Sequence, residues 1–307
     1  MASRKTDAPR SANRLPYALT LPALIVIGVL FLFPGIYNVV LAFQKLTPYD
    51  LPSDAKWVGF HNFVKLFQDP ETGSATFNTV VWLTVVTVVA RLAIGLGLAL
   101  LLQSPVLERW RMRGLSRTLV LVPWMVPPVV AVACWKWIFD ADTGVLNQFL
   151  VALHILPHGE AFLAQTSTAW WAVATIIIWR ELPFVIVVLM AGLQSIPKER
   201  YEAAALDSAG RFQSFRYITL PGLRPVMVIV VLMTVIQTFN NFVYVWLSTA
   251  GGPGTYTQVL ATRLYSAAFV SNHLGEGAAI GIVMTLVMAL FAMVYLRMTG
   301  EREGRSA

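Results

Sequence analysis

The sequence predicts an all-α membrane protein that crosses the bilayer six times, with both termini in the cytoplasm. Of its 307 residues, 57% are hydrophobic and only 13% are charged, whereas soluble domains carry about 25% charged residues. Whole windows of about 20 residues lack a polar face, which is typical of membrane spans. Basic residues gather in alternate loops between these windows, and Lys and Arg are retained on the cytoplasmic side.

The apolar windows lie at residues 16–43, 77–102, 118–138, 169–190, 223–247 and 276–297. The first follows a basic stretch, as in a secretion signal, but it is much longer than the apolar core of about 7 to 15 residues that such signals have. We therefore expect an uncleaved first span. Residues 1–15 and 298–307 are predicted to be cytoplasmic tails, and residues 16–297 a single transmembrane domain.

Prolines interrupt two of the predicted spans. The third contains Pro123, Pro127 and Pro128, and the fourth contains Pro183. A proline in a helix frees a backbone carbonyl, so each bend must face protein or water. Membrane helices also tolerate proline widely, and these bends therefore give only mild support for a transport path.

The basic residues outside the spans determine the predicted orientation. One side holds sixteen: Arg4, Lys5, Arg10, Arg14, Arg109, Arg111, Arg113, Arg117, Lys198, Arg200, Arg211, Arg216, Arg224, Arg297, Arg302 and Arg305. The other side holds four: Lys45, Lys56, Lys65 and Arg263. This asymmetry predicts that the side with sixteen, and with it both termini, is cytoplasmic.

Several other classes of protein fit the sequence poorly. The net charge of +7 is spread between apolar segments rather than clustered on one face, so we expect no nucleic-acid partner. The single cysteine and the four histidines have no metal-ligand spacing, and we expect no metal and no cofactor. No Ser or Cys nucleophile has a nearby base, and no phosphate-binding loop is present. The chain is therefore predicted not to be an enzyme.

The longest predicted cytoplasmic loop, residues 191–222, contains the pattern of a short exposed helix. Pro197 suits a first helical position, Glu199 and Glu202 favour the positive end of the helix dipole, and Gly210 can end the helix. The alanines at 203–205 form a small face that would allow another backbone to approach closely.

This loop resembles the EAA signature of permease subunits of binding-protein-dependent ATP-binding-cassette importers. The matching residues are Glu202, Ala203, Ala204, Ile218, Leu220 and Pro221. Ser208 departs from the pattern, because the family usually has glycine there, and the turn at this position is expected to differ slightly. Residues 191–197, 238–242 and 251–254 resemble the carbohydrate branch, in particular the first type of maltose and glycerol-phosphate permease.

The resemblance implies the type I importer permease architecture and a location in the plasma membrane of a prokaryote. It implies four kinds of partner besides the lipid bilayer: a second, related permease, two copies of an ATP-binding subunit, an extracytoplasmic solute-binding protein and a carbohydrate. The chain would form half of an alternating-access path, and ATP would be hydrolysed by the separate subunit. The coupling residues would be Glu202, Ala203, Ala204, Asp207, Ser208 and Gly210. A disaccharide, a longer oligosaccharide and a glycerol phosphodiester all suit this branch.

Polar residues recur in the predicted fifth span. Gln237, Asn240, Asn241, Tyr244 and Ser248 have a spacing of three and four, which predicts one polar face on an apolar helix. Such residues can be hydrogen-bonding glue between helices. They can also form a sugar site, with neutral donors and acceptors and an aromatic platform from Tyr244 and Phe239. We favour the sugar site.

Three ionisable residues, Arg91, Arg180 and Glu181, fall at membrane depth, where charged groups are costly and are usually paired. One hypothesis is that Arg91 and Glu181 neutralise each other. Lys136 lies near a span end and is assigned to interfacial anchoring. A secondary, ion-coupled transporter is the alternative function, although the sequence has no clear internal repeat of the kind such transporters show.

Overall fold

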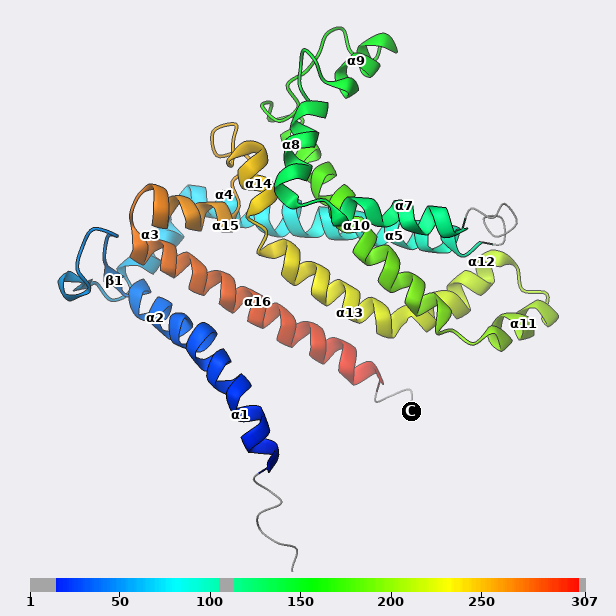
Figure 1. Ribbon diagram of the computed structural model, residues 1–307, viewed down its shortest axis with the longest axis horizontal. Helices are drawn as coiled ribbons and strands as arrows, with labels where there is room; N and C mark the ends of the chain where they lie inside the picture. The colour runs from blue at the N-terminus through cyan, green and yellow to red at the C-terminus, as the bar shows by residue number, and fades with distance from the viewer. Residues whose placement is uncertain (1–14, 105–112, 304–307) are drawn as a thin grey trace, which may run out of the picture. The chain divides into compact units, whose positions relative to one another are not determined.

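The computed structural model describes residues 15–104 and 113–303, which are mostly helical (Figure 1). Most of the predicted cytoplasmic tails, together with Arg109 and Arg111, lies outside the described residues. The chain forms two compact units. One comprises residues 1–66 and 266–283, and the other comprises residues 67–265 and 284–307.

The first unit contains the first span and a small hairpin. Its elements are α1 (Leu15–Ile27), α2 (Phe33–Ala42), β1 (Gln44–Lys45), β2 (Lys56–Trp57), most of α3 (His61–Gln68) and the start of α16 (Leu274–Glu303). The two strands are antiparallel, with Gln44 opposite Trp57. Asn62 donates hydrogen bonds to the carbonyls of Ala42 (2.8 Å) and Gln44 (2.9 Å), so α3 is tied to the end of α2.

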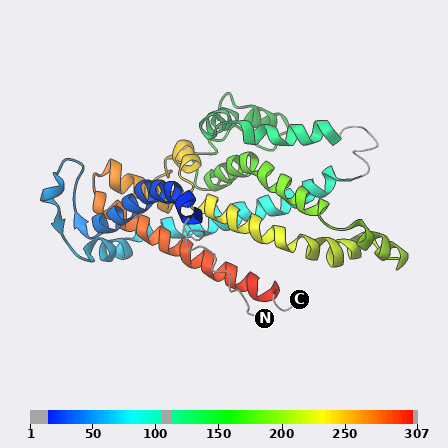
Figure 2. The ribbon, with the colours of Figure 1, turned by 60° about the horizontal axis from the view of Figure 1, so that its bottom comes forward.

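The second unit contains the remaining helices. They are α4 (Pro70–Phe77), α5 (Thr87–Leu102), α7 (Arg113–Met125), α8 (Pro128–Ile138), α9 (Val145–Ala152), α10 (Ala169–Gln194), α11 (Lys198–Leu206), α12 (Arg211–Ser214), α13 (Leu220–Phe239), α14 (Val243–Thr249), α15 (Leu260–Tyr265) and the rest of α16. Helices α5, α10 and α13 pack against one another, as Figure 2 shows in cyan, green and yellow.

Five of the six predicted spans are present as helices long and apolar enough to cross a membrane. They cover Leu19–Ala42, Pro70–Leu102, Ala169–Gln194, Arg211–Phe239 and Leu274–Met298. The sixth is a bent pair, Gly114–Met125 and Pro128–Ile138, whose axes differ by 97°. The structure thus has up to six spans among the described residues, in agreement with the predicted fold class.

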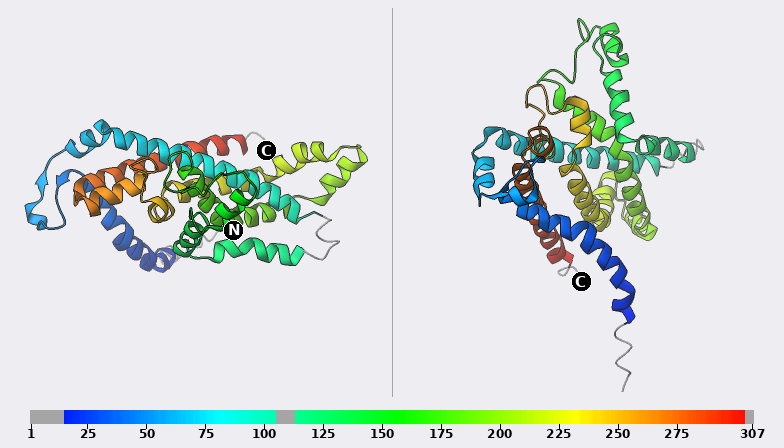
Figure 3. Two further views of the ribbon diagram at one scale, coloured as in Figure 1. Left: turned by 90° about the horizontal axis from the view of Figure 1, so that it is seen from above. Right: turned by 60° about the vertical axis from the view of Figure 1, so that its left-hand side comes forward.

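The third predicted span, residues 118–138, is not one continuous helix, and it bends at its prolines as the sequence predicted. Helix α7 ends at Met125 and α8 begins at Pro128, with the intervening Pro127 in an extended conformation (ψ 140°). Two consecutive prolines remove two N–H donors, and Pro128 pushes Pro127 out of the helical region. Figure 3 shows the resulting change of direction, with α7 and α8 in green.

The fifth predicted span, residues 223–247, is also wrong as a continuous helix. Helix α13 ends at Phe239, and α14 begins only at Val243. The two asparagines between them bond to backbone groups: the Asn240 amide donates to the carbonyl of Ile236 (3.1 Å), and Asn241 Oδ1 accepts from the N–H of Tyr244 (3.3 Å). Asparagine competes with the helical ladder in this way and favours helix ends.

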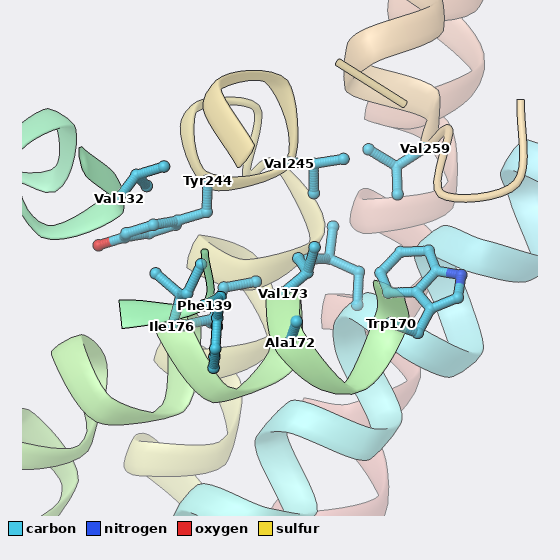
Figure 4. Close-up of a cluster of buried hydrophobic side chains, with 11 residues drawn as sticks. Val132, Phe139, Trp170, Ala172, Val173, Ile176, Tyr244, Val245 and Val259 are labelled. Carbon is cyan, nitrogen blue, oxygen red and sulfur yellow. The ribbon is translucent and has the colours of Figure 1, made fainter. Parts of the chain in front are cut away.

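Two apolar clusters hold the second unit together. One lies between α5, α10 and the start of α13, where Gly95 allows close approach: a Cβ at this position would lie 2.8 Å from Val185 Cγ1. The other brings Trp170, Val173 and Ile176 of α10 together with Tyr244 and Val245 of α14 (Figure 4). These contacts fix α13 and α14 against α10 on both sides of the break.

Candidate functional site

A polar cavity of about 340 Å³ lies within the second unit, beside both helix breaks. It is lined by Arg91 of α5, Trp124 of α7, Arg180, Glu181 and Phe184 of α10, and Gln237, Thr238 and Asn241 at the end of α13. Polar and ionisable side chains at membrane depth usually face such an interior path rather than lipid. This cavity is therefore the candidate functional site.

Among the residues that the structure describes, Glu181 is the only carboxylate that lines the cavity, and two side chains bind it. Arg180 Nη1 lies 2.8 Å from Glu181 Oε1, and the Tyr244 hydroxyl donates to the same oxygen at 2.7 Å. Arg180 also donates from Nε to the carbonyl of Val126 at 3.3 Å. The arginine therefore satisfies a carbonyl at the proline break while it neutralises the carboxylate.

Arg91 is only 2% exposed and bonds to neutral groups. Its Nε donates to the carbonyl of Thr87 (3.2 Å), and its Nη2 donates to the hydroxyl of Thr238. Among the described residues Arg91 and Glu181 form no direct ion pair, because Glu181 contacts its own neighbour Arg180, and Glu181 acts on Arg91 only through its electrostatic field. Adjacent residues on α10 reach each other more readily than residues on two separate helices.

The break in the fifth span separates the five predicted substrate-binding residues. Gln237 and Asn241 line the cavity, as Thr238 does. Asn240 is exposed, and its amide bonds back to its own helix. Phe239 is buried at 2% exposure and is not among the cavity-lining residues. The prediction of one continuous polar face is therefore wrong, because the chain does not remain helical through Asn240 and Asn241.

Tyr244, which was predicted to form an aromatic platform, is not among the residues that line the cavity. Its ring is buried in the apolar cluster, and its hydroxyl oxygen points away from Val173 and Trp170 (Figure 4). Ser248, the last residue of the predicted face, donates to the Tyr244 carbonyl at 2.6 Å, one turn back on α14. Tyr244 thus orients Glu181, which itself faces the cavity.

The aromatic side chains that do line the cavity are Trp124 and Phe184. Their ring centroids are 6.2 Å apart and their planes are tilted by 45°. The analysis of the sequence did not select them as site residues. A signal was available, because each directly follows a proline inside a predicted span, Pro123 and Pro183 respectively.

The predicted coupling loop forms two short helices beyond the C-terminal end of α10, whereas α9 lies beyond its N-terminal end (Figure 1). Helix α11 contains the signature residues Glu202, Ala203 and Ala204 and has no buried residue. It ends at Leu206, before Gly210, which instead precedes α12 as its N-cap. The expectation that Gly210 ends the helix is therefore wrong.

Ser208 has the backbone conformation that glycine favours. Its φ is 56°, two residues after α11 ends at Leu206 and directly after the C-cap Asp207. Helices often end with a left-handed residue at this position, which is usually glycine because it has no Cβ. The turn is thus formed with serine in a left-handed conformation that costs less for glycine.

The loop exposes apolar side chains around the coupling helix. Leu206 is 87% exposed, and Phe212 and Tyr217 are similarly open. A hydrogen bond of 3.0 Å joins the Tyr201 hydroxyl of α11 to Thr219, one residue before α13 begins. The helix is therefore tied to the membrane-spanning part while most of its surface is free to contact another protein.

The sequence from residue 91 to residue 302 matches the family described as the binding-protein-dependent transport system inner membrane component. The chain belongs to this family. It is therefore a multi-pass permease of the inner membrane, as the resemblance of its predicted cytoplasmic loop implied. A secondary transporter, the alternative function, is rejected.

The similarity to other permeases extends over nearly the whole chain. The permease is 35% identical, over 94% of its length and 91% of the relative, to the sulfoquinovosyl glycerol transport system permease protein SmoG of Agrobacterium fabrum. It is 31% identical, over 92% of its length and 93% of the relative, to the trehalose/maltose transport system permease protein MalF of Thermococcus litoralis.

A solved structure has the same fold as this chain. This structure belongs to a bacterial ABC transporter involved in the import of the acidic polysaccharide alginate. It superimposes with a TM-score of 0.81 at 24% identity, over 95% of this chain and 96% of the other.

Proposed function

We propose that this permease carries a saccharide or glycoside inward and forms half of the path together with a second, related permease. Two copies of a separate ATP-binding subunit would drive the cycle, and a solute-binding protein would deliver the cargo. Relatives that align with nearly the full length of the chain support a carbohydrate cargo. Their names refer to sulfoquinovosyl glycerol, to trehalose and maltose, and to diacetylchitobiose.

The observation that carries this proposal is the exposed helix α11 at the end of α10. A nine-residue helix with no buried residue gains little from its own fold, because short isolated helices are marginal in water. Its small alanines and the exposed Leu206 suit close packing against another protein. We therefore assign to α11 the contact with the ATP-binding subunit, with Glu202, Ala203 and Ala204 at its centre and Asp207, Ser208 and Gly210 at its end.

The path from this contact to the cavity follows two helices. Helix α10 runs without interruption from Gln194, next to the coupling loop, to Glu181 and Arg180 at the cavity. The Tyr201–Thr219 hydrogen bond connects α11 to the start of α13, whose other end carries Gln237 and Thr238. A displacement of α11 would thus reach the cavity from two sides.

The cavity itself offers the groups that a sugar requires. Gln237 and Asn241 provide neutral amide donors and acceptors for hydroxyl groups, and Trp124 and Phe184 provide apolar ring faces. We assign Gln237 and Asn241 to direct solute contact. Tyr244 acts through Glu181, and Asn240 and Phe239 serve to form the break and its packing.

Glu202→Lys tests the coupling role. In an interface that excludes water, a reversed charge replaces attraction with repulsion, which costs several kcal/mol where the residues meet a like charge. We expect normal membrane insertion but weak association with the ATP-binding subunit and loss of solute-stimulated ATP hydrolysis. Both are measured on the complex after co-purification.

Glu199→Lys is the matched control, because it makes the same charge change in the exposed first turn of the same helix. An exposed charge contributes little, and the control should retain most of the stimulation. Full stimulation in the Glu202→Lys complex, with normal association, would remove the coupling role from this helix.

A further inference from the structure

We propose that the cavity selects a saccharide that carries an anionic group and that Arg91 is the residue that recognises this group. This inference rests on the proposed function, since it names the class of solute that would occupy the path. The shared chemistry is one carboxylate, sulfonate or phosphate on an otherwise hydroxylated ring.

The charges of the cavity are not balanced. Its lining contains two guanidinium groups, Arg91 and Arg180, and one carboxylate, Glu181. Arg180 and Glu181 neutralise each other at 2.8 Å. Tyr244 and Val126 add neutral hydrogen bonds to this pair. One positive charge, that of Arg91, therefore remains.

Arg91 is held in place without a carboxylate of its own. Among the residues that the structure describes, it makes no ion pair, and its hydrogen bonds from Nε and Nη2 go to the carbonyl of Thr87 and the hydroxyl of Thr238. These bonds fix the plane of the guanidinium and leave Nη1 without a hydrogen bond to the described protein. A fixed guanidinium with free N–H groups suits a carboxylate, sulfonate or phosphate.

The burial of Arg91 makes its positive charge selective for anionic solutes. Arg91 is 2% exposed, and burying a charge without a partner is costly, so a buried charge normally has an opposite charge beside it. Glu181 acts on Arg91 electrostatically but is already in contact with Arg180. An anionic solute in the cavity would supply Arg91 with a direct partner, whereas a neutral solute would leave the net positive charge in place. The positive charge of Arg91 also repels cationic solutes.

The remaining lining residues suit the rest of such a solute. Trp124 and Phe184 present ring faces, and Gln237 and Asn241 present amides for hydroxyl groups. A cavity of about 340 Å³ is at the small end of the range of ligand sites, roughly 300 to 1,000 Å³. It is therefore large enough to hold one sugar unit.

Direct binding to the assembled complex in nanodiscs, without the solute-binding protein, tests the proposal. The probes are cellobiose and cellobiouronate, which differ only at one C6 group, and inorganic phosphate. We expect the uronate to bind at least about tenfold more tightly than the neutral sugar, and more tightly than phosphate alone, by isothermal titration. Arg91→Gln should remove this preference, and Arg91→Lys should retain part of it.

A second variant keeps the test valid if Arg91 is needed for folding. Asn241→Asp changes one cavity-lining amide to a carboxylate of almost the same shape, so it should neutralise the cavity and abolish the preference for the uronate. Gln148→Glu is the control, because it adds a negative charge on the exposed surface of α9.

Equal affinity for the two sugars, or a preference that survives both Arg91→Gln and Asn241→Asp, would overturn the proposal. So would binding of phosphate as tight as that of the uronate, since this would show an adventitious anion site. The proposed transport function would stand in each case if Asn241→Ala weakened both sugars alike. It would fall together with the proposal if the complex bound neither sugar.

Discussion

Tyr244→Phe removes one hydroxyl from the centre of the permease and leaves the ring in place. In the structure this hydroxyl donates to Glu181 Oε1 at 2.7 Å, from a residue that is 3% exposed. A hydrogen bond to a charged group contributes about 1.5 to 3 kcal/mol. The lower end applies here, because the Glu181 side chain is 17% exposed and keeps its 2.8 Å contact with Arg180.

The expected loss of stability is therefore about 1.5 kcal/mol, with no cavity formed, since the apolar cluster around the ring is unchanged. It is measured as a lower thermal-unfolding midpoint of the purified complex in detergent. Tyr217→Phe is the matched control, because its hydroxyl is in the exposed coupling loop and makes no hydrogen bond among the described residues. The control should unfold at the wild-type temperature.

A double-mutant cycle with Glu181→Gln assigns the effect to this contact. If the hydroxyl acts through Glu181, the two changes should be non-additive by about 1 kcal/mol or more. Solute-stimulated ATP hydrolysis should fall in both single variants, because the carboxylate loses its orientation. Additive losses, or a Tyr244→Phe complex that is as stable as wild type, would refute the role given to Tyr244.

The helix contacts give two further predictions. Gly95→Ala should destabilise the complex by about 1 to 3 kcal/mol, because its Cβ would lie 2.8 Å from Val185 Cγ1. Gly97→Ala is the control, because a Cβ at Gly97 would have no atom within 4 Å, and it should change the melting temperature little. If the Gly95→Ala and Gly97→Ala complexes melted at the same temperature, α5 and α10 would separate easily at Gly95. Ser208→Gly should stabilise the end of α11 by about 0.5 to 1 kcal/mol, because φ is 56° there. Slower amide hydrogen exchange in α11 checks this, and Ser195→Gly, at φ −80°, should show no such gain.

The hydrophobic windows predicted where the spans lie but not where they break. Windows of about 20 apolar residues indicate spans because backbone groups in lipid must be satisfied within a helix. The same windows gave no reason to divide residues 223–247 at Asn240, because the apolar pattern resumes at once. The competition of two asparagine amides for the backbone determined the break, and hydropathy does not include this term.

The coupling loop was more predictable than the cavity. Its residues are consecutive, so their spacing predicted a helix with Pro197 at its start, and α11 begins at the next residue. The cavity joins four helices that are distant in the sequence, and a one-dimensional pattern does not determine which helices are neighbours. Arg91 and Glu181 were therefore recognised as costly charges, but the sequence did not reveal that Arg180 is the direct partner of Glu181. The predicted cytoplasmic location of both termini stays a prediction.

Helix α10 is continuous at the cavity, as the helix Pro70–Leu102 that carries Arg91 also is, and it lies beside two spans that are broken. Its 26 residues make a rod about 39 Å long, whereas the chain bends at Val126–Pro127 and again at Asn240–Asn241. Because α10 is continuous, a displacement at one of its ends moves the other end by a similar amount. The two bends in the neighbouring spans accommodate the accompanying rotation. Opening and closing the path would then require little change in the apolar contacts of α10, and the hydrogen bonds at the two bends would determine how stiff each state is.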